Sequence, residues 1–471
     1  MEQFVKAVTD INNAVNSFAW GPIMLILLVG TGIFLTVRTR CIQVRRFGWI
    51  MKNTIGSVFK KREKNGDSKN LTPFQAMCTA LAGTVGTGNI AGVTGAVFVG
   101  GPGAAFWMWV SAFFGMCTKY SEIALAMKYR ETDADGAYHG GPMYYIKNGL
   151  GKYWKWLAVI FAILGGLASF GIGNISQSSE IAGAVLGLGG LEDQMVTRVI
   201  IGVVLAIVVA IVIIGGVKRI GQVTSYLVPV MSVFFILAGI VVIVLRITEV
   251  PAAFATIFKG AFNMKAVGGG VFGYVIMTAI RQGFARGVFS NEAGLGSAPI
   301  AHAASTTKEP VEQAVWGVFE VFVDTIIICT ITCLTVVLSG IELGTTALDT
   351  YASKGAAAVA AFNTILPGNL AGTIIQISLL LFALSTIISW SYYGTQCWGY
   401  LSKNNKAVAM VYKIVFILVC IVGATGNGTL MWDIADTLNG LMAIPNLIAL
   451  LALSGVVAKI TKDYFKKDTL K

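Results

Sequence analysis

Residues 82–92 read AGTVGTGNIAG, an apolar stretch with glycine at positions 83, 86, 88 and 92 and asparagine at 89. Each glycine costs a helix about 1 kcal/mol relative to alanine, so this cluster predicts a break in the helix. A broken helix leaves amide N–H groups and carbonyl oxygens without their usual partners. Freed N–H groups at the start of the next half-helix suit an anion, and freed carbonyls at the end of the preceding one suit a cation. The spacing therefore predicts a binding site for opposite charges.

Two other interpretations of this stretch stay open. Gly88 and Gly92 have the Gly-x-x-x-Gly spacing of closely packed membrane helices. The string GTGNIAG also faintly resembles a dinucleotide-binding fingerprint, but that motif needs a βαβ unit, and the surrounding sequence indicates none.

The composition places this stretch in a membrane. Of the 471 residues, 55% are hydrophobic and only 12% are charged, and the mean hydropathy of +0.74 exceeds what a soluble domain tolerates. Seven cysteines form no CxxC pair, and most lie in apolar runs, where they act as small hydrophobic residues. The start, MEQFVKAVTD, lacks the basic region of a cleavable signal, so the first apolar run is expected to remain as a span. We expect an all-α polytopic membrane protein.

Eleven apolar runs are long enough to cross about 30 Å of hydrocarbon. The second and seventh are interrupted by glycines, and RQGFARG in the seventh puts two arginines near mid-membrane, which predicts a second break there. With the first run set aside, ten runs form two sets of five. Because an odd number of spans ends on the opposite side of the membrane, the second set must have the inverted orientation. Broken helices at matching positions of inverted halves are typical of secondary transporters. The runs cover residues 18–37, 72–98, 103–128, 155–185, 196–215, 220–246, 268–301, 312–339, 367–397, 407–423 and 430–458.

The runs divide the chain into four expected parts. Residues 1–70 hold the extra helix and a basic segment, 71–250 the first repeat, 251–458 the inverted second repeat and 459–471 a basic tail. The stretch from residue 38 to residue 70 carries ten of the 35 Lys and Arg residues, and the tail carries five more. By the positive-inside rule both are cytoplasmic, which leaves the N-terminus outside and the C-terminus inside. The net charge of +12 is thus a topological signal, and we expect no nucleic-acid partner.

Four long strings resemble the alanine or glycine:cation symporter family, sodium-coupled amino-acid transporters of prokaryotes. They are TVGTGNIAGV (84–93), GGPGAAFWMWVSAFFG (100–115), GGPMYYI (140–146) and FARGVFSNEAGLGSAPIAHA (284–303). The resemblance implies the leucine-transporter fold, with five plus five inverted helices and here one extra N-terminal span. It also implies a small neutral amino acid as substrate, alanine or glycine, a sodium ion as coupling ion, no organic cofactor and no enzymatic activity. We expect a multi-pass protein of a prokaryotic plasma membrane that functions in the lipid bilayer as a monomer.

The string VGTGN (85–89) matches the Val-Gly-x-Gly-Asn core of the broken helix in that fold. The match implies that the N–H groups of Gly86, Thr87 and Gly88 bind the substrate carboxylate and that Asn89 lies beside it. Asn89 also matches a residue that serves a second sodium ion in some relatives. One amide does not establish a second ion here.

Sodium needs hard oxygen ligands, and in this fold the eighth core helix supplies hydroxyl groups. The string LFALSTIISWSYYG places Ser385 and Thr386 side by side, with the Phe382 carbonyl one turn earlier. The resemblance implies a sodium site made of these three residues and the carbonyls of Ala82 and Val85. An offset of one residue stays possible. The alternative is that the two hydroxyls bond only to carbonyls of their own helix.

Further residues are placed around the same cavity by the resemblance. Gln177 is expected to bond one end of the substrate, and Trp390 either walls the cavity or serves in packing. Gln282, Gly283 and Phe284 flank the expected second break and are assigned to the substrate amine and side chain. Charged residues in the spans are expected to form ion pairs or gates, because unpaired charge at that depth is costly. They are Arg281, Arg286, Glu292, Glu320 and Asp324.

Three other functions fit the sequence less well. An intramembrane hydrolase would need a nucleophile with a base, or an HExxH pattern, and the sequence has neither at a usable spacing. A channel would need a repeated pore motif or rings of charge. Proton-coupled amino-acid symport is the main alternative, and it favours a titratable residue where Ser385 and Thr386 offer neutral oxygens.

Overall fold

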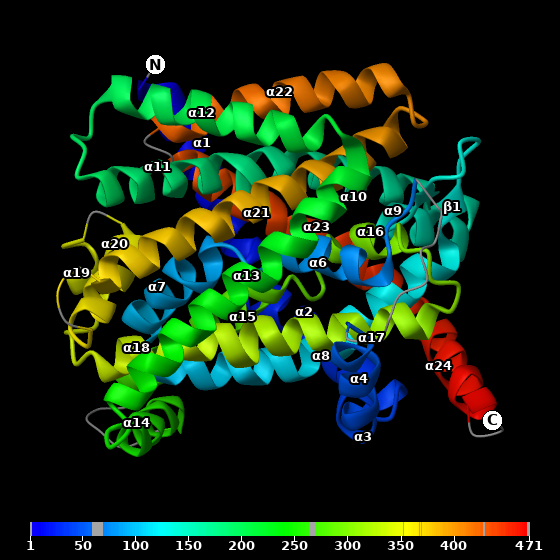
Figure 1. Ribbon diagram of the computed structural model, residues 1–471. Coiled ribbons are helices and arrows are strands. Elements are labelled where there is room, and N and C mark those ends of the chain that lie inside the picture. Colours follow the sequence, from blue (N-terminus) through cyan, green and yellow to red (C-terminus); the bar gives the residue numbers. More distant parts are fainter. Residues whose placement is uncertain are drawn as a thin grey trace.

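Helices make up almost all of the computed structural model, and most of them lie side by side along one direction (Figure 1). In the described residues the only sheet is a short antiparallel pair, β1 (Glu131–Thr132) and β2 (Tyr138–His139). The predicted all-α class is confirmed. Residues 59–68 of the basic segment and 469–471 of the tail, which contribute to the predicted topology, lie outside the described residues. The structure describes residues 2–58, 69–262, 270–351, 353–366, 368, 370–426 and 429–468.

The helices follow the order of the predicted spans. The N-terminal part holds α1 (Glu2–Ala19), α2 (Pro22–Arg38), α3 (Ile42–Arg45), α4 (Phe47–Asn53) and α5 (Ile55–Val58). Next come α6 (Pro73–Thr84), the turn η1 (Thr87–Asn89), α7 (Ala91–Gly100), α8 (Gly103–Tyr129), α9 (Pro142–Tyr145), η2 (Ile146–Leu150), η3 (Lys152–Trp154), α10 (Lys155–Phe170), η4 (Gly171–Ile175), α11 (Ser176–Gly189), α12 (Met195–Ile213), α13 (Gly216–Leu245) and α14 (Val250–Phe262). The rest comprises α15 (Gly270–Asn291), α16 (Ala298–Ala303), α17 (Pro310–Val321), η5 (Phe322–Cys329), α18 (Thr330–Leu338), α19 (Thr345–Leu348), α20 (Lys354–Asn363), α21 (Leu370–Leu401), α22 (Lys406–Thr425), α23 (Thr429–Ala452) and α24 (Ser454–Asp468).

The break predicted in the second span is confirmed. The helix α6 starts at a capping box. The Gln75 backbone N–H donates a hydrogen bond to the Thr72 hydroxyl, and the Thr72 backbone N–H donates one to the Gln75 side-chain oxygen. The helix ends at Thr84, and the chain then runs through η1 into α7 at an angle of 56° to α6. The glycine cluster therefore divides one span into two half-helices.

The second break was predicted at the wrong place. The helix α15 continues through RQGFARG to Asn291, and the chain unwinds only at residues 292–297 before α16. There Glu292, Gly294 and Gly296 have φ of 55°, 94° and 85°, a left-handed backbone that ends a right-handed helix. A Cβ at Gly283 would lie 2.5 Å from a backbone oxygen of α8. Glycine within RQGFARG thus serves close packing of α15 on α8.

The two half-helices α6 and α16 are joined at their ends by backbone hydrogen bonds. The Leu71 amide donates to the Ala304 carbonyl at 2.9 Å, and the Thr306 amide donates to the Leu71 carbonyl at 2.8 Å. Leu71 and Ser305 form a parallel bridge. The chain entering the first broken helix is thereby tied to the chain leaving the second.

Several helices present apolar side chains to the surface, as contact with lipid requires. In the described residues, seven helices are long and apolar enough to cross a membrane, and up to nine if each bent pair is one span. Exposed valine and isoleucine side chains line α12, α13 and α22, including Ile200, Val230 and Val411. The number of eleven spans stays a prediction, while the membrane character is clear from these surfaces.

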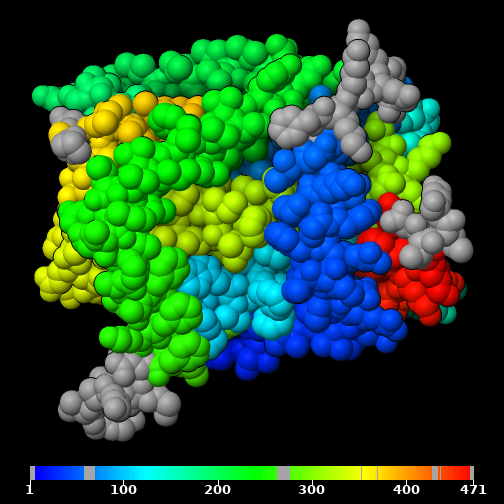
Figure 2. All heavy atoms as spheres, turned by 60° about the horizontal axis from the view of Figure 1, so that its bottom comes forward, coloured from blue at the N-terminus to red at the C-terminus, as the bar shows by residue number. Residues whose placement is uncertain are grey.

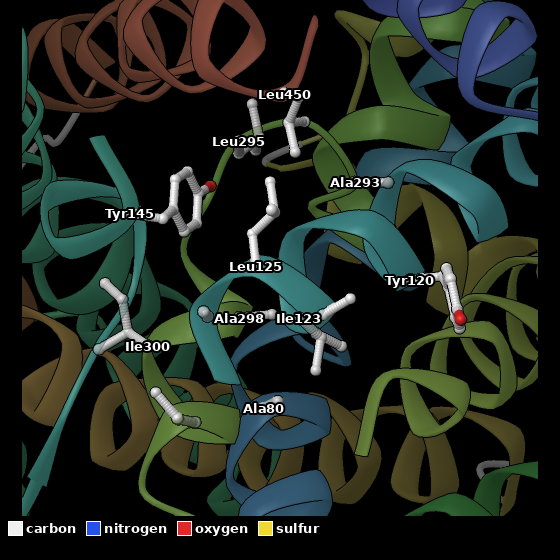
Figure 3. Packing of buried hydrophobic residues seen from close by; sticks show 14 of the residues in the cluster. Ala80, Tyr120, Ile123, Leu125, Tyr145, Ala293, Leu295, Ala298, Ile300 and Leu450 are labelled. Carbon is white, nitrogen blue, oxygen red and sulfur yellow. The ribbon is translucent and has the colours of Figure 1, made fainter. Parts of the chain in front are cut away.

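The interior is closely packed around the second break. Leu125 of α8, Leu295 beside the break and Leu450 of α23 are fully buried and lie close together (Figure 3). On another face, the blue segment of α3–α5 lies near the red α24 (Figure 2), where the Trp49 ring contacts Phe465 at 5.1 Å between centroids. Fully buried apolar side chains therefore pack beside the second break.

Candidate binding site at the first helix break

Four of the five predicted sodium ligands come together between α6 and α21. The Ser385 hydroxyl lies 2.8 Å from the Phe382 carbonyl oxygen and 3.3 Å from that of Ala82. The Thr386 hydroxyl lies 2.9 Å and 3.1 Å from the same two oxygens. Val85 directly follows α6, and its amide closes the last helical turn on Leu81. The hydroxyls thus bond across to α6 as well as to their own helix, and the cluster offers two hydroxyl and two carbonyl oxygens.

The amides of the turn differ in their hydrogen bonds. The Gly86 N–H donates to Oδ1 of Asn89 at 2.9 Å, and the Asn89 and Ile90 amides donate to the carbonyls of Gly86 and Thr87. In the part of the chain that the structure describes, the amides of Thr87 and Gly88 donate no hydrogen bond. These two buried or nearly buried N–H groups are therefore free to meet an acceptor, whereas that of Gly86 already has one.

Glycine is needed in the turn because of space. Gly86 has an extended backbone with φ of −130°, which any residue adopts. A Cβ there would lie 2.6 Å from the Thr386 hydroxyl oxygen, and a Cβ at Gly88 would lie 3.2 Å from the Phe289 ring. Around Gly92, by contrast, a Cβ would meet nothing within 4 Å, so this glycine makes no close helix contact.

Gln177 and Asn89 connect the turn to neighbouring helices. The Thr87 hydroxyl donates to Oε1 of Gln177 at 3.1 Å, and the Gln177 side chain donates to the Ile172 carbonyl at 3.1 Å. Asn89 donates to the Ser290 hydroxyl at 2.8 Å and to the Asp324 carboxylate at 2.6 Å. Gln177 therefore contacts the first break, and Asn89, which is part of it, links the break to α15 and η5.

Asp324 was predicted to form an ion pair or a gate. In the structure its hydrogen-bond partners at the first break are neutral side chains. Its carboxylate accepts hydrogen bonds from Asn89, Ser290 and Thr325, and the side chain is 1% exposed. Sequence analysis missed the contact with Asn89 and the role of Ser290. The sequence indicated part of this, since an unpaired carboxylate inside a membrane span must accept hydrogen bonds from nearby side chains.

Gln282, Gly283 and Phe284 do not lie at a break, because α15 is continuous through them. A Cβ at Gly100 would lie 2.9 Å from Gln282 Cβ, and the Phe284 ring packs on Trp107 of α8 with 5.7 Å between centroids. The ring that covers the Gly88 position is instead Phe289, near the end of α15. The sequence signal for its role was its position shortly before NEAGLGS, whose glycines end the helix.

Trp390 lies at the second break, bonded to Glu292 and packed on α10–α11. Its indole N–H donates to one Glu292 oxygen at 3.1 Å, and the Ser297 hydroxyl donates to the other at 2.5 Å. A Cβ at Gly173 would lie 2.4 Å from Trp390 Cβ. The tryptophan therefore fixes Glu292 rather than forming part of the first break.

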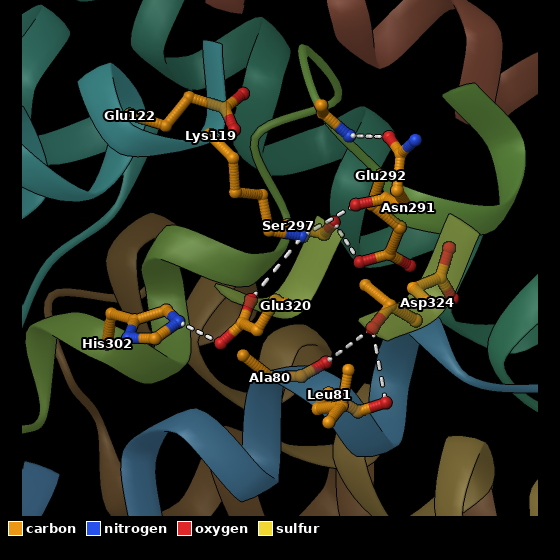
Figure 4. Close-up of polar contacts among 12 residues, drawn as sticks. Ala80, Leu81, Lys119, Glu122, Asn291, Glu292, Ser297, His302, Glu320 and Asp324 are labelled. Atoms are coloured by element: carbon orange, nitrogen blue, oxygen red, sulfur yellow. Dashed lines mark hydrogen bonds and ion pairs between the residues drawn. The ribbon is translucent and has the colours of Figure 1, made fainter. Parts of the chain in front are cut away.

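A buried ion network fills the second break (Figure 4). The Lys119 ammonium donates to the Asn291 carbonyl at 2.7 Å and lies 3.8 Å from the Glu320 carboxylate. The other Glu320 oxygen lies 2.6 Å from His302. Glu320 thus forms an ion pair as predicted, although Lys119 was missed. Of the two arginines in RQGFARG, Arg281 is exposed, and the Arg286 guanidinium lies 5.1 Å above the Phe289 ring.

A cavity of about 150 Å³ lies away from the candidate ligands, farther along α21. His139 in its wall bonds Gln396 of α21 at 2.8 Å and Asp133 at 2.9 Å. Tyr392, also in the wall, is six residues beyond Thr386, or about 9 Å along a helix. The cavity therefore lies beside β2, separated along α21 from the oxygen cluster.

The chain is similar throughout its length to known transporters. A sequence model described as the sodium:alanine symporter family matches residues 5–471. The sodium/alanine symporter AgcS of Methanococcus maripaludis is 50% identical over 456 residues, covering 96% of each chain, and the probable sodium/glutamine symporter GlnT of Bacillus subtilis is 36% identical over 486 residues, covering 100% of this chain and 95% of that one. The crystal structure of MhsT in complex with L-phenylalanine, a leucine-transporter-type structure, aligns with a TM-score of 0.55 at 15% identity, over 85% of this chain and 99% of that one. The chain therefore belongs to the sodium:alanine symporter family, and it is a membrane transporter of the leucine-transporter fold rather than an enzyme.

Proposed function

We propose that the protein couples the entry of sodium to the uptake of a small neutral amino acid, alanine or glycine, by alternating access. The observation that carries this proposal is the oxygen cluster of Ala82, Phe382, Ser385 and Thr386, which offers only neutral, hard ligands. Such a set suits a monovalent hard cation. In the described residues no group of three or more His, Cys, Asp and Glu residues could hold a metal ion, so a transition-metal substrate has no support.

The cation and the amino acid are coupled because their binding groups adjoin. Gly86 faces Thr386 at close range, and the free amides of Thr87 and Gly88 follow directly. A sodium ion in the oxygen cluster, with Val85 as a further carbonyl ligand, places positive charge next to the carboxylate held by these amides. It also draws α6 toward α21, since both helices supply ligands.

The other end of the amino acid lies among Gln177, Asn89 and Phe289 in this proposal. The Gln177 and Asn89 side chains supply polar atoms, and the Phe289 ring limits the space above Gly88. A pocket bounded by a ring discriminates side-chain size, with each methylene worth about 1–3 kcal/mol. Small side chains such as hydrogen or methyl fit this arrangement.

The orientation proposed from the charges puts the N-terminus outside and the C-terminus in the cytoplasm. Arg40 and Arg45 before α4 and Lys459 on α24 are exposed, and the contact between Trp49 and Phe465 brings the two basic segments to one end of the molecule. This common end supports the positive-inside assignment. We further propose that one chain is sufficient for transport.

Purified protein in liposomes tests the coupling. With an inward sodium gradient and an interior-negative potential, labelled alanine should accumulate, and one net charge across 100 mV contributes about 2.3 kcal/mol, or roughly fiftyfold. Potassium replaces sodium in the control, with the same potential and pH. Equal accumulation in both buffers would refute sodium coupling.

Proton coupling has one observation in its favour, the buried Asp324 carboxylate bonded to Asn89 at the break. A second set of liposomes therefore carries an inward proton gradient without sodium. Accumulation in that set, abolished by Asp324→Asn, would establish protons as the coupling ion. Labelled glutamine is added in parallel to distinguish a larger polar substrate from alanine and glycine.

A further inference from the structure

We propose that Trp20, in the elbow between α1 and α2, is a positioning residue that sets the size of the amino-acid chamber by holding Phe289 over Gly88. This inference rests on the proposed function. Trp20 lies outside both sets of five helices, in the N-terminal extension. Substrate selection would then depend on the α1–α2 segment, which supplies none of the proposed substrate-binding groups.

The first step is the anchoring of the elbow. Near the end of α1, Asn16 donates to the Thr437 hydroxyl at 2.9 Å and to the Asp436 carboxylate at 3.2 Å. The Trp20 indole N–H donates to the Asp436 carbonyl oxygen at 3.1 Å. These three bonds tie the Asn16 and Trp20 side chains to α23.

The second step is the burial of the elbow against α23. Ala19 is fully buried and Trp20 is 5% exposed, although they lie in a segment near the chain terminus. A Cβ at Gly440 would lie 3.0 Å from Ala19 Cβ and 3.0 Å from Trp20 Nε1. The indole therefore sits in a recess of α23 and has little freedom to move.

The third step connects the indole to the chamber. The Trp20 and Phe289 rings lie 6.4 Å apart between centroids at 52°, within the range of aromatic contact. Phe289 also contacts the turn, where a Cβ at Gly88 would lie 3.2 Å from Cε1 and 3.3 Å from Cδ1 of the ring. Trp20 thus packs against the same ring that limits the space over Gly88.

Removal of the indole should let Phe289 retreat and enlarge the chamber. The affinity for large side chains should then rise relative to that for alanine. A purely structural anchor would behave differently, because it would lower the stability of the fold and weaken binding of every amino acid alike. The ratio of two affinities separates these roles, since global destabilisation does not change it.

The test measures dissociation constants of alanine and leucine for purified protein in sodium buffer. Trp20→Ala should lower the ratio of the leucine constant to the alanine constant by about tenfold, the effect of one or two methylenes of space. Trp20→Phe, which keeps a ring in the recess, should restore most of the wild-type ratio. Trp109→Ala is the matched control, because its indole also donates a hydrogen bond, to Thr330 at 2.8 Å, and packs on α14.

A double mutant decides whether Trp20 acts through Phe289. Phe289→Ala alone should lower the ratio at least as much, and adding Trp20→Ala should change it little further. An unchanged ratio in Trp20→Ala, or full additivity in the double mutant, would overturn the inference. Asn16→Ala loosens the elbow without removing the indole and serves if Trp20→Ala fails to fold, with a smaller fall in the ratio expected. A wild-type protein that binds no amino acid at all would instead overturn the proposed function.

Discussion

The two helix breaks use glycine for opposite purposes. At the first break, Gly86 has an ordinary backbone and is needed because a side chain would strike Thr386. At the second, Gly294 and Gly296 have positive φ and are needed for the conformation itself. The first break keeps amides free, while the second is filled by side chains, with its own Glu292 bonded to Trp390 and Ser297, and Lys119 of α8 bonded to the Asn291 carbonyl. The open turn at the first break has free amides for the proposed ligand, whereas the filled turn at the second break makes fixed contacts with neighbouring helices.

The strongest test of this contrast is Gly86→Ala. The added methyl group would overlap the Thr386 hydroxyl at 2.6 Å, so it should disrupt the oxygen cluster and reduce sodium-dependent alanine binding by more than about a hundredfold. Binding is measured with labelled alanine on purified protein. Gly92→Ala, where a Cβ meets nothing within 4 Å, is the matched control and should bind normally. Equal affinities in the two variants would remove the steric argument.

Loss of one cation ligand should have the next largest effect. Ser385→Ala and Thr386→Ala each delete a hydroxyl oxygen, so the sodium concentration for half-maximal alanine uptake should rise about tenfold, equivalent to about 1.4 kcal/mol. Ser378→Ala on the same helix, whose hydroxyl donates to the Ile374 carbonyl one turn earlier, is the control. If the sodium response stays unchanged in both site variants, the cation binds elsewhere.

A change at the second break should act on stability more than on affinity. Gly294→Ala forces a side chain into positive φ, at a cost of about 1–2 kcal/mol, and its Cβ would lie 2.7 Å from Leu28. The melting temperature should fall by about 2 °C or more, while alanine affinity in the folded protein stays within a few-fold. The pair of measurements is a thermal melt and a binding curve. Abolished binding without a change in melting temperature would mean that the second break contacts ligand directly.

The smallest effect is expected at Gln282, which the sequence placed beside a break. Because α15 is continuous there and the side chain packs near Gly100, Gln282→Ala should change alanine affinity by less than about twofold. Uptake kinetics in liposomes provide the measurement. A large rise in the alanine KM would restore Gln282 as a substrate ligand.

The sequence predicted features that depend on local glycine density and on adjacent hydroxyl groups. The first break lies where AGTVGTGNIAG indicates it, and the Ser385 and Thr386 hydroxyls bond the Ala82 carbonyl, which the resemblance assigned to the same predicted sodium site. The second break could not be placed, because glycine in RQGFARG and glycine in NEAGLGS look alike in sequence. The structure distinguishes them, since Gly283 touches the backbone of α8 whereas Gly294 and Gly296 have positive φ.

Contacts between distant segments were also beyond the sequence. Lys119 and Asn291 are 172 positions apart, and Asn89 and Asp324 are 235 apart. No periodicity along either helix indicates which buried charge meets which carbonyl. The requirement that a buried charge find a partner was predictable, but the identity of that partner depends on the tertiary arrangement.

The bridge between Leu71 and Ser305 couples the half-helices α6 and α16 mechanically. With the Leu71 amide and carbonyl both bonded to the chain after α16, neither half-helix can tilt alone without breaking these bonds. We therefore expect the two half-helices to move together, so that in the proposed function a sodium ion bound between α6 and α21 also shifts α16. Hydrogen exchange at Leu71 and Thr306 should accordingly slow together when sodium and alanine are added.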